Sequence, residues 1–401
     1  MKISGTIYLD HQATTPVDER VLDEMLPHFR ESFGNPHSAD HTLGWKSALA
    51  VEQAAVRIAE LIGADSDEII FTSGATEANN MALLGLKRNV RSESGRRRFI
   101  LSDIEHKCVL AAGRVISSRP GFSADGLPVD KHGCVLLESL EGALDNDVLA
   151  VSIMAVNNEI GTIQDIGKIS DLVRKAGAVF HCDAAQAPIA MDLRGIAEQV
   201  DLLSLSAHKM YGPKGIGALY IRRELQAHLE PLIHGGGQQN GLRAGTIPTA
   251  LCVGMGAAAE FLNSDEAVEK RALLRQRRDR FVRKMASLPW SIGVNGAGAA
   301  ARHPGNANMC FAGFTAQDIL QALQPHLAAS TGSACTSGIP EPSHVLKAIG
   351  LSPETAEASV RFSLGFDTTD TDVDDAVALI DNVLGELSTN GLFNDKLCRA
   401  A

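Results

Sequence analysis

The chain contains few aromatic residues and no long apolar run. Only 4% of its 401 residues are Phe, Trp or Tyr, whereas 45% are hydrophobic and 37 are glycine. This composition suits helices packed closely on a sheet better than a sandwich of aromatic-rich strands. No stretch approaches the roughly 18 uninterrupted apolar residues of a membrane-spanning helix, so we expect no membrane association.

Positive charge is also scarce. The formal net charge is −11, and the basic run in "GRRRF", residues 95–99, stands alone. A chain of this charge is a poor candidate for direct nucleic-acid binding. The N-terminal stretch "MKISGTIYLDHQATTP" has no apolar core of signal-peptide length. We therefore expect a cytoplasmic protein whose acidic surface keeps it in solution.

The chain lacks the paired cysteines of a disulfide framework or a zinc site. Its seven cysteines are scattered and never spaced as C-x-x-C: Cys108, Cys134, Cys182, Cys252, Cys310, Cys335 and Cys398. This pattern favours a reducing compartment and predicts no metal centre. Cys335 stands apart because its segment, "STGSACTSGIPE", consists mostly of small residues. We interpret Cys108 and the other cysteines of apolar or helical stretches as small core residues.

Short apolar runs alternate with helical periodicity along the first 260 residues. "EIIFTSGATEANNMALLGL" and "RFILSDIEHKCVLAAGRVI" each predict a strand followed by a helix, and "VLAVS", "AVFHCD" and "DLLSLS" predict further strands. These strands are apolar without alternation, which indicates a parallel sheet covered on both faces in an α/β fold. Functional residues should then gather at the carboxyl ends of the strands.

The length of the chain predicts two domains. Residues 249–290 are mostly helical, and beyond them "NANMCFAGF" and "ASVRFSLGF" predict strands and "DVDDAVALIDNVLGEL" an amphipathic helix. We place the boundary near residue 264. The large domain then spans 16–264, and the small domain comprises 1–15 and 265–401.

Three motifs follow predicted strands and carry polar residues. In "TSGATEANN" the unpaired N–H groups of a helix start, at Ala75 and Thr76, suit a phosphate. The alternative is an ordinary helix capped by the side chain of Ser73 or Thr76. In "SLSAHKMYGPKGIG", burial at a strand end would lower the pKa of Lys209, as a Schiff-base amine requires. The alternative is a lysine whose ammonium reaches solvent.

The third motif is "HCDAAQA", in which Asp183 ends a strand. A carboxylate there could pair with a protonated pyridine nitrogen and keep the ring an electron sink. The alternative is a helix N-cap. A phosphate cradle, an aldehyde-binding lysine and a pyridinium partner together are the three protein groups that pyridoxal 5'-phosphate requires.

These motifs closely resemble the class V branch of the fold-type I pyridoxal-phosphate enzymes. Within that branch the chain is similar to the cysteine desulfurases of the group that includes the iron–sulfur-cluster and nitrogen-fixation enzymes. The resemblance is carried, in chain order, by "YLDHQATTPVD", "FGNPHS", "FTSGATEANN", "EHKCVL", "VNNEIGTIQDI", "HCDAAQA", "SAHKMYGPKGIGALY", "HGGGQQNGLRAGT", "STGSACTSGIPEPSHVL" and "SVRFSLGFDTT". It implies a fold-type I PLP-dependent transferase, with a mostly parallel seven-stranded sheet in the large domain and a smaller C-terminal α/β domain.

The resemblance also implies roles around the cofactor. Lys209 would bind pyridoxal 5'-phosphate covalently and then move the proton at the substrate α-carbon. Asp183 would pair with the ring nitrogen, and His106 would stack on the ring and act as an acid/base. The other implied contacts are Ala75, Thr76, Ser206 and His208 at the phosphate, Gln186 and Asn158 at the ring oxygen, and Thr246 at the phosphate of a neighbouring subunit in a homodimer.

For the substrate, the resemblance implies L-cysteine. Arg361 would hold its carboxylate through a bidentate pair, with Asn35 and Asn158 assisting. Cys335, on a loop at about 328–341, would take the sulfur as a persulfide while L-alanine leaves. The sulfur would then pass to an acceptor or scaffold protein for iron–sulfur cluster assembly or thiolation.

Several alternatives stay open on the residues alone. His106 could be a core histidine at a helix start, Arg361 a surface arginine on a strand, and Asn158 a turn cap. The same fold could serve a selenocysteine lyase or an aminotransferase, which need no protein thiol. A non-catalytic scaffold that docks partners through the acidic surface or the tail after Ser388 is a third hypothesis.

Overall fold

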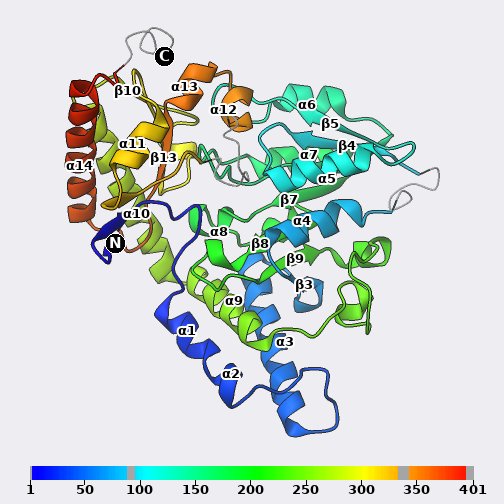
Figure 1. Ribbon diagram of the computed structural model, residues 1–401. Helices are drawn as coiled ribbons and strands as arrows, with labels where there is room; N and C mark the ends of the chain where they lie inside the picture. Colours follow the sequence, from blue (N-terminus) through cyan, green and yellow to red (C-terminus); the bar gives the residue numbers. More distant parts are fainter. Residues whose placement is uncertain (1, 88–94, 333–342, 394–401) are drawn as a thin grey trace.

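The computed structural model describes residues 2–87, 95–332 and 343–393. Its largest sheet is formed by β3 (Ile69–Thr72), β4 (Arg98–Ser102), β5 (Ser123–Leu127), β6 (Val148–Ser152), β7 (Val179–Asp183), β8 (Leu202–Ser206) and β9 (Gly217–Ile221). The spatial order of these strands is β3-β9-β8-β7-β6-β4-β5 (Figure 1). All neighbours pair in parallel except β9, which is antiparallel to β3 and β8. The predicted seven-stranded, mostly parallel sheet is confirmed.

Successive residues of these strands point into two different cores. In β7, Val179 belongs to one buried cluster and Phe180 to the other. The first cluster is closed by α4 (Ala75–Leu84) and α5 (Lys107–Ser117). The second includes residues of α3 (Thr42–Ile62), α7 (Ile166–Lys175) and α9 (Thr249–Leu262). Helices therefore cover both faces, which explains why the strands are apolar at every position.

Strand β9 is connected to its preceding strand in a different way from the parallel strands. It follows β8 after a short connection that includes the 3₁₀ turn Ala207–Lys209, with no crossover helix between them. Such a connection returns the chain beside the strand it has just left, so the pairing is antiparallel. The approach is close: a Cβ placed on Gly217 would lie 2.6 Å from the Cα of Gly74, so only glycine fits there.

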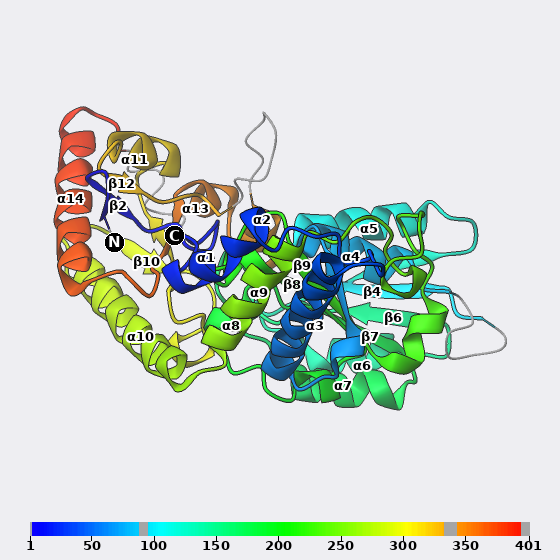
Figure 2. The same cartoon turned by 90° about the horizontal axis from the view of Figure 1, so that it is seen from below.

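Two smaller sheets lie on the other side of the molecule, at the left in Figure 1. One is antiparallel and contains β10 (Ile292–Val294), β11 (Asn306–Phe311) and β13 (Ser359–Ser363). The other contains β1 (Lys2–Ile3), β2 (Thr6–Tyr8) and β12 (Leu327–Ala328). The accompanying helices are α10 (Asp265–Ala286), α11 (Ala316–Ala322) and α14 (Asp370–Thr389), which Figure 2 shows from below.

The N-terminal segment lies against elements from the end of the chain. β2 pairs in parallel with β12, and Asp10 bridges to Ser363 of β13. This brings residues that follow β2 next to the sheet that carries Arg361. Our division of the chain into domains at residue 264, which falls between α9 and α10, stays a prediction.

The remaining helices are short. They are α1 (Glu19–Met25), α2 (Pro27–Arg30), α6 (Leu137–Ala143), α8 (Ala187–Ala190), α12 (His344–Ala348) and α13 (Pro353–Glu357). Within the described ranges, no helix combines the length and apolar character needed to cross a bilayer.

Candidate active site

A cavity of about 640 Å³ opens where the parallel strands end. The residues that follow β3, β4, β6, β7 and β8 all contribute to its wall, together with Gln12–Thr14 and Arg361. Ten of the predicted site residues line it: Ala75, Thr76, His106, Asn158, Asp183, Gln186, Ser206, His208, Lys209 and Arg361. The carboxyl ends of the strands thus meet here, as expected for an α/β sheet.

The first turn of α4 faces this cavity without a side-chain cap. Its N-cap is Gly74, at φ 151° and ψ 179°, and no side chain bonds to the N–H groups that follow it. The alternative in which Ser73 or Thr76 caps the helix is therefore wrong. Ser206, at the end of β8, and Lys214 line the cavity with this turn. Uncapped N–H groups, a hydroxyl and a cation form a suitable cradle for a phosphate.

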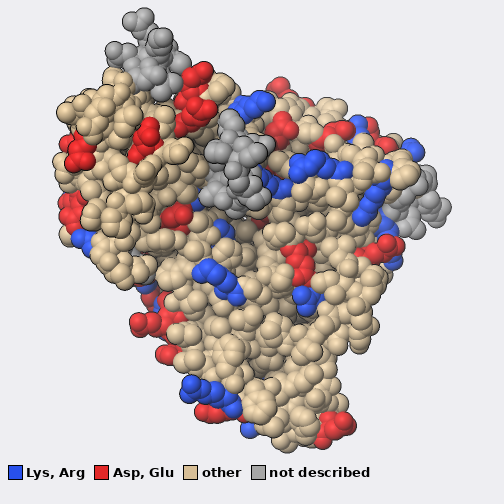
Figure 3. All heavy atoms as spheres, in the orientation of Figure 1, with Lys and Arg blue, Asp and Glu red and all other residues tan. Residues whose placement is uncertain are grey.

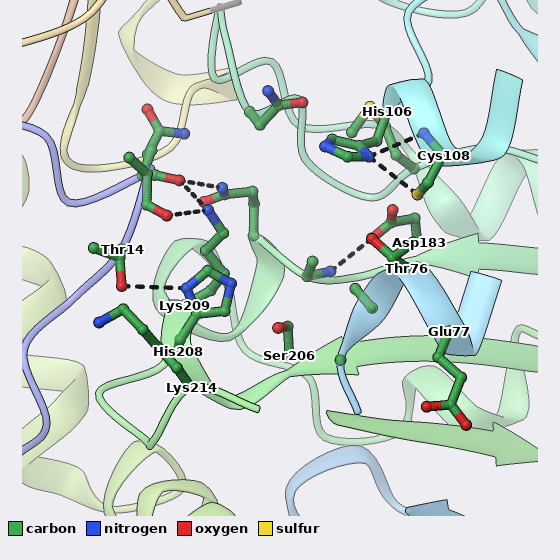
Figure 4. A pocket seen from close by; sticks show the side chains of 18 of the residues that line it. Thr14, Thr76, Glu77, His106, Cys108, Asp183, Ser206, His208, Lys209 and Lys214 are labelled. Carbon is green, nitrogen blue, oxygen red and sulfur yellow. Dashed lines mark hydrogen bonds between the residues drawn. The ribbon is translucent and has the colours of Figure 1, made fainter. Parts of the chain in front are cut away.

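Asp183 is a buried carboxylate held by two neutral donors. Its Oδ2 accepts a hydrogen bond from Nδ2 of Asn79 at 2.7 Å. Its Oδ1 accepts from the backbone N–H of Ala185 at 2.9 Å (Figure 4). The side chain does not cap a helix, because α8 has Gln186 at its N-cap. Neutral donors leave the negative charge of Asp183 uncompensated, so a cationic ring nitrogen in the cavity fits this carboxylate.

A second carboxyl group lies behind Asp183. Glu105 is fully buried, and its Oε1 accepts from the backbone N–H of Met154. Burial, reinforced by the negative charge of Asp183, holds the pKa of Glu105 well above its usual range. Glu105 is therefore held toward its neutral form beside Asp183.

Lys209 enters the cavity from the 3₁₀ turn that follows β8. Its Nζ donates to the carbonyl oxygens of Gln12 and Ala13, at 2.5 and 2.7 Å. Its ammonium is therefore held by two backbone oxygens at the wall of the cavity, and the side chain is partly buried. Beside it, Nδ1 of His208 lies 3.2 Å from Oγ1 of Thr14. Burial, with the charges of Lys209 and Lys214, lowers the pKa of His208 to about 4, so His208 is neutral at pH 7.

His106 caps α5 and faces the cavity at the same time. Its Nδ1 accepts the backbone N–H of Cys108 at 3.2 Å and lies 3.0 Å from the Cys108 Sγ. Figure 4 shows both contacts. Our interpretation of Cys108 was incomplete, because the partly buried side chain packs against the core and its thiol also lines the cavity. Of the other cysteines interpreted in the same way, Cys182, Cys252 and Cys310 are buried and Cys134 is partly buried.

Arg361 lies on β13 with only 3% of its surface exposed, so it is not a surface arginine. Its Nη2 pairs with Oδ1 of Asp10 at 2.7 Å and donates to Oγ of Ser330 at 2.8 Å. Its Nη1 donates to the carbonyl oxygen of Asn158 at 2.8 Å. The turn at Asn158 is closed by its neighbour Asn157, whose Oδ1 accepts two backbone N–H groups. Asn158 therefore does not cap this turn, and it lines the cavity.

Two predicted residues are not part of this cavity in the single chain, and a third is not among the described residues. Asn35 and Thr246 are exposed and absent from the cavity wall, and Oδ1 of Asn35 accepts the backbone N–H of His37. Cys335 lies outside the described residues. The described chain reaches the cavity wall at Gly332.

The sequence did not lead us to several residues at the site. Asn79 supports Asp183, Thr14 contacts His208, and Lys214 and Gln12 line the cavity. One signal was available for Asn79, because it lies three and four residues before Ala82 and Leu83, on the apolar face of its helix. The others are brought in by contacts between segments far apart in the chain.

Comparison with known proteins agrees with this geometry. The Aminotransferase class-V family matches residues 7–376. The cysteine desulfurase IscS of Rickettsia akari is 44% identical over 383 residues, which cover 95% of this chain and 92% of that protein. The IscS of Rickettsia typhi is 45% identical over 382 residues, with the same coverage. The chain belongs to the cysteine desulfurases of the aminotransferase class-V family.

Solved structures resemble the desulfurase over nearly its whole length. A NifS-like protein has a TM-score of 0.87 and 34% identity, covering 95% of this chain and all of that one. SspA in complex with cysteine has a TM-score of 0.76 and 37% identity, covering 89% and 98%. These likenesses confirm the predicted fold-type I architecture.

Enzymes of this family depend on pyridoxal phosphate, and the residues of the desulfurase fit this cofactor. The uncapped turn of α4 suits the phosphate and Asp183 suits the ring nitrogen. Lys209 supplies an amine in the same cavity, from the end of a different strand.

Proposed function

We propose that the desulfurase converts L-cysteine to L-alanine and transfers the sulfur to Cys335. The observation that carries this proposal is the meeting of Lys209, Asp183 and Arg361 in one cavity. An amine, a buried uncompensated carboxylate and a buried guanidinium are the groups needed for an amino acid bound to pyridoxal phosphate.

The roles of the residues follow from their chemistry. Pyridoxal phosphate, when bound, supplies an aldehyde for the substrate amine and a ring that withdraws electrons from the α-carbon. Lys209 forms the covalent link to the cofactor and moves the α-proton. Asp183 holds the ring nitrogen protonated, with Gln186 and Asn158 at the ring oxygen. Ala75, Thr76, Ser206 and His208 hold the phosphate.

Sulfur transfer joins one thiolate to one sulfur atom. Arg361 and Asn158 orient the substrate carboxylate, while the deprotonated thiol of Cys335 attacks the substrate sulfur. The S–S bond forms as the C–S bond breaks, and the electron pair of that bond remains on carbon. His106 supplies a proton in this step, and L-alanine leaves. No external oxidant or reductant is consumed.

We further propose a homodimer that completes each site. Seven large apolar side chains in the segment from α1 through the first turns of α3 are 41–65% exposed: Leu22, Leu26, Phe29, Phe33, Leu43, Trp45 and Leu49. Figure 3 shows a largely uncharged surface over these helices, at the bottom of the view. An apolar patch of this kind is typical of a protein interface. Asn35 and Thr246 would then reach the cavity of the partner.

The persulfide needs a recipient. We propose an acceptor or scaffold protein of iron–sulfur cluster assembly or thiolation, in the cytoplasm. The net charge of −11 favours a recipient that presents a basic surface over direct contact with nucleic acid.

Alanine release tests the proposed function. The purified protein, loaded with pyridoxal phosphate, is given L-cysteine or L-selenocysteine in the presence of a thiol reductant, and L-alanine is quantified. We expect L-alanine from L-cysteine, and we expect Cys335→Ser to lose this activity while keeping the absorbance of the bound cofactor. Alanine from selenocysteine alone would replace our proposal by the selenocysteine lyase alternative.

A further inference from the structure

Two buried N–H donors at the cavity have no acceptor among the described residues. They are Nε2 of Gln12 and Nε of Arg361. Both residues line the cavity, and they are only 2% and 3% exposed. An unpaired buried donor is costly, so two of them in one cavity indicate a site for an acceptor.

The orientation of the Gln12 amide is determined by its neighbours. Nη1 of Arg302 donates to Oδ1 of Asn306 at 2.9 Å, so the other end of the Asn306 amide must be its nitrogen. That nitrogen donates to Oε1 of Gln12 at 2.6 Å and to the carbonyl oxygen of Glu159 at 3.0 Å. Arginine has no acceptor, so this series of contacts cannot be reversed. Nε2 is therefore the unpaired end of Gln12.

Gln12 lies between the amine of Lys209 and the guanidinium of Arg361. The backbone carbonyl oxygen of Gln12 accepts a hydrogen bond from Nζ of Lys209. Its backbone N–H donates to Oγ of Ser363 at 2.9 Å, two residues from Arg361 on β13. An amino acid carries its carboxylate and its amine on the same carbon atom. A substrate that reacts at Lys209 and is held by Arg361 would therefore lie beside Gln12, which lines the same cavity.

Arg361 does not face the substrate as a full positive charge. Asp10 already pairs with its Nη2, which neutralises much of the guanidinium charge. A second donor is then needed to bind a carboxylate firmly and in one orientation.

We propose that Gln12 is a substrate-binding residue whose Nε2 donates a hydrogen bond to the α-carboxylate, alongside Nε of Arg361. This inference rests on the proposed function, because it takes an α-amino acid as the ligand. It adds to that function a neutral residue that binds the substrate carboxylate.

Ligand binding to the cofactor-loaded enzyme tests Gln12 separately from catalysis. Dissociation constants for L-alanine and for cysteamine, which lacks a carboxylate, are measured from the change in cofactor absorbance. Gln12→Glu keeps the oxygen that faces Asn306 and replaces the donor by an anion. Gln12→Met, a second variant of similar length, removes both polar atoms. Gln317→Glu, which adds a charge at an exposed site on α11, is the control.

We expect both Gln12 variants to weaken L-alanine binding roughly ten- to hundredfold, with cysteamine binding changed less than about twofold. The control should match the wild type for both ligands. Unchanged L-alanine binding, or equal loss for both ligands, would overturn the assignment. Alanine release from cysteine by the wild type is scored separately. If the wild type released no L-alanine, the proposed function would be wrong, whereas the binding result for Gln12 would still hold.

Discussion

The Cys108 Sγ lies 3.0 Å from Nδ1 of His106, so the cavity contains a thiol that contacts the expected acid/base. The contact is local, because His106 caps the helix in which Cys108 is the second residue. The backbone N–H of Cys108 also donates to Nδ1, so the capping bond does not depend on the thiol.

Cys108→Ala should therefore be mild. It removes the contact with Nδ1 of His106 and the sulfur that accepts from Nδ2 of Asn79 at 3.3 Å, and it leaves the backbone cap. We therefore expect the rate of alanine release to fall by roughly two- to tenfold. His106→Gln should reduce the rate by roughly 10²- to 10⁴-fold, because it removes the acid/base. Steady-state rates for both variants check this. If Cys108→Ala abolished sulfur transfer, Cys108 would replace Cys335 as the essential thiol.

Asn79 should be important for stability as well as for the site. Asn79→Ala leaves Oδ2 of Asp183 buried without its side-chain donor, and we expect the free energy of unfolding to fall by about 1–3 kcal/mol. Asn80→Ala, one residue further along α4 and less buried, should cost less than about 0.5 kcal/mol. Urea unfolding of the cofactor-free protein measures both. Equal losses in the two variants would contradict the importance of the Asn79–Asp183 bond.

Stability should decrease in mild acid. Burial lowers the pKa of His11 and His181 to about 4 and that of His303 to about 3, below the value of about 6.5 in an unfolded chain. The stabilisation is complete above pH 6.5 and is lost as the pH falls toward 4, because the unfolded chain binds more protons. Each histidine should contribute roughly 2 kcal/mol of loss between pH 7.5 and 5. Glu105, with its raised pKa, opposes this trend.

Urea unfolding at pH 7.5 and pH 5 checks this prediction. The free energy of unfolding of His181→Gln should decrease less than that of the wild type between these two pH values. The difference should be the roughly 2 kcal/mol that one histidine contributes. A free energy of unfolding that stays constant or rises toward pH 5 would show that these histidines do not control acid stability.

The apolar surface on α1–α3 should hold two subunits together. Trp45→Glu places a charge in this patch, and we expect it to halve the solution mass and to weaken cofactor retention, since Thr246 would no longer reach the partner's phosphate. Leu273→Glu, at an equally apolar exposed position on α10, is the control and should leave the mass unchanged. Light scattering measures the mass. A wild-type monomer would contradict the proposed dimer.

The parts of the site that the sequence predicted share one property. Asp183 and Lys209 end or closely follow apolar strands, and the start of α4 follows another, so their positions depend on local pattern and on the rule for parallel sheets. The antiparallel β9 was harder to predict, because its direction depends on a short connection after Lys209.

Other residues reach the site only through long-range contacts. Gln12 meets Asn306 across 294 residues of the chain, and Asp10 meets Arg361 across 351. No periodicity or spacing within either segment indicates such a pairing. The place of Cys108 in the cavity wall was missed for a related reason: its helix is amphipathic, and the pattern does not show that its first turn opens into a cavity.

The most direct measurement is mass spectrometry of the protein after a single turnover with L-cysteine labelled at sulfur. We predict one labelled sulfur atom on Cys335 for each L-alanine released, and neither product in Cys335→Ser with the cofactor still bound. Labelled persulfide on another cysteine, or normal alanine release from Cys335→Ser, would contradict the account.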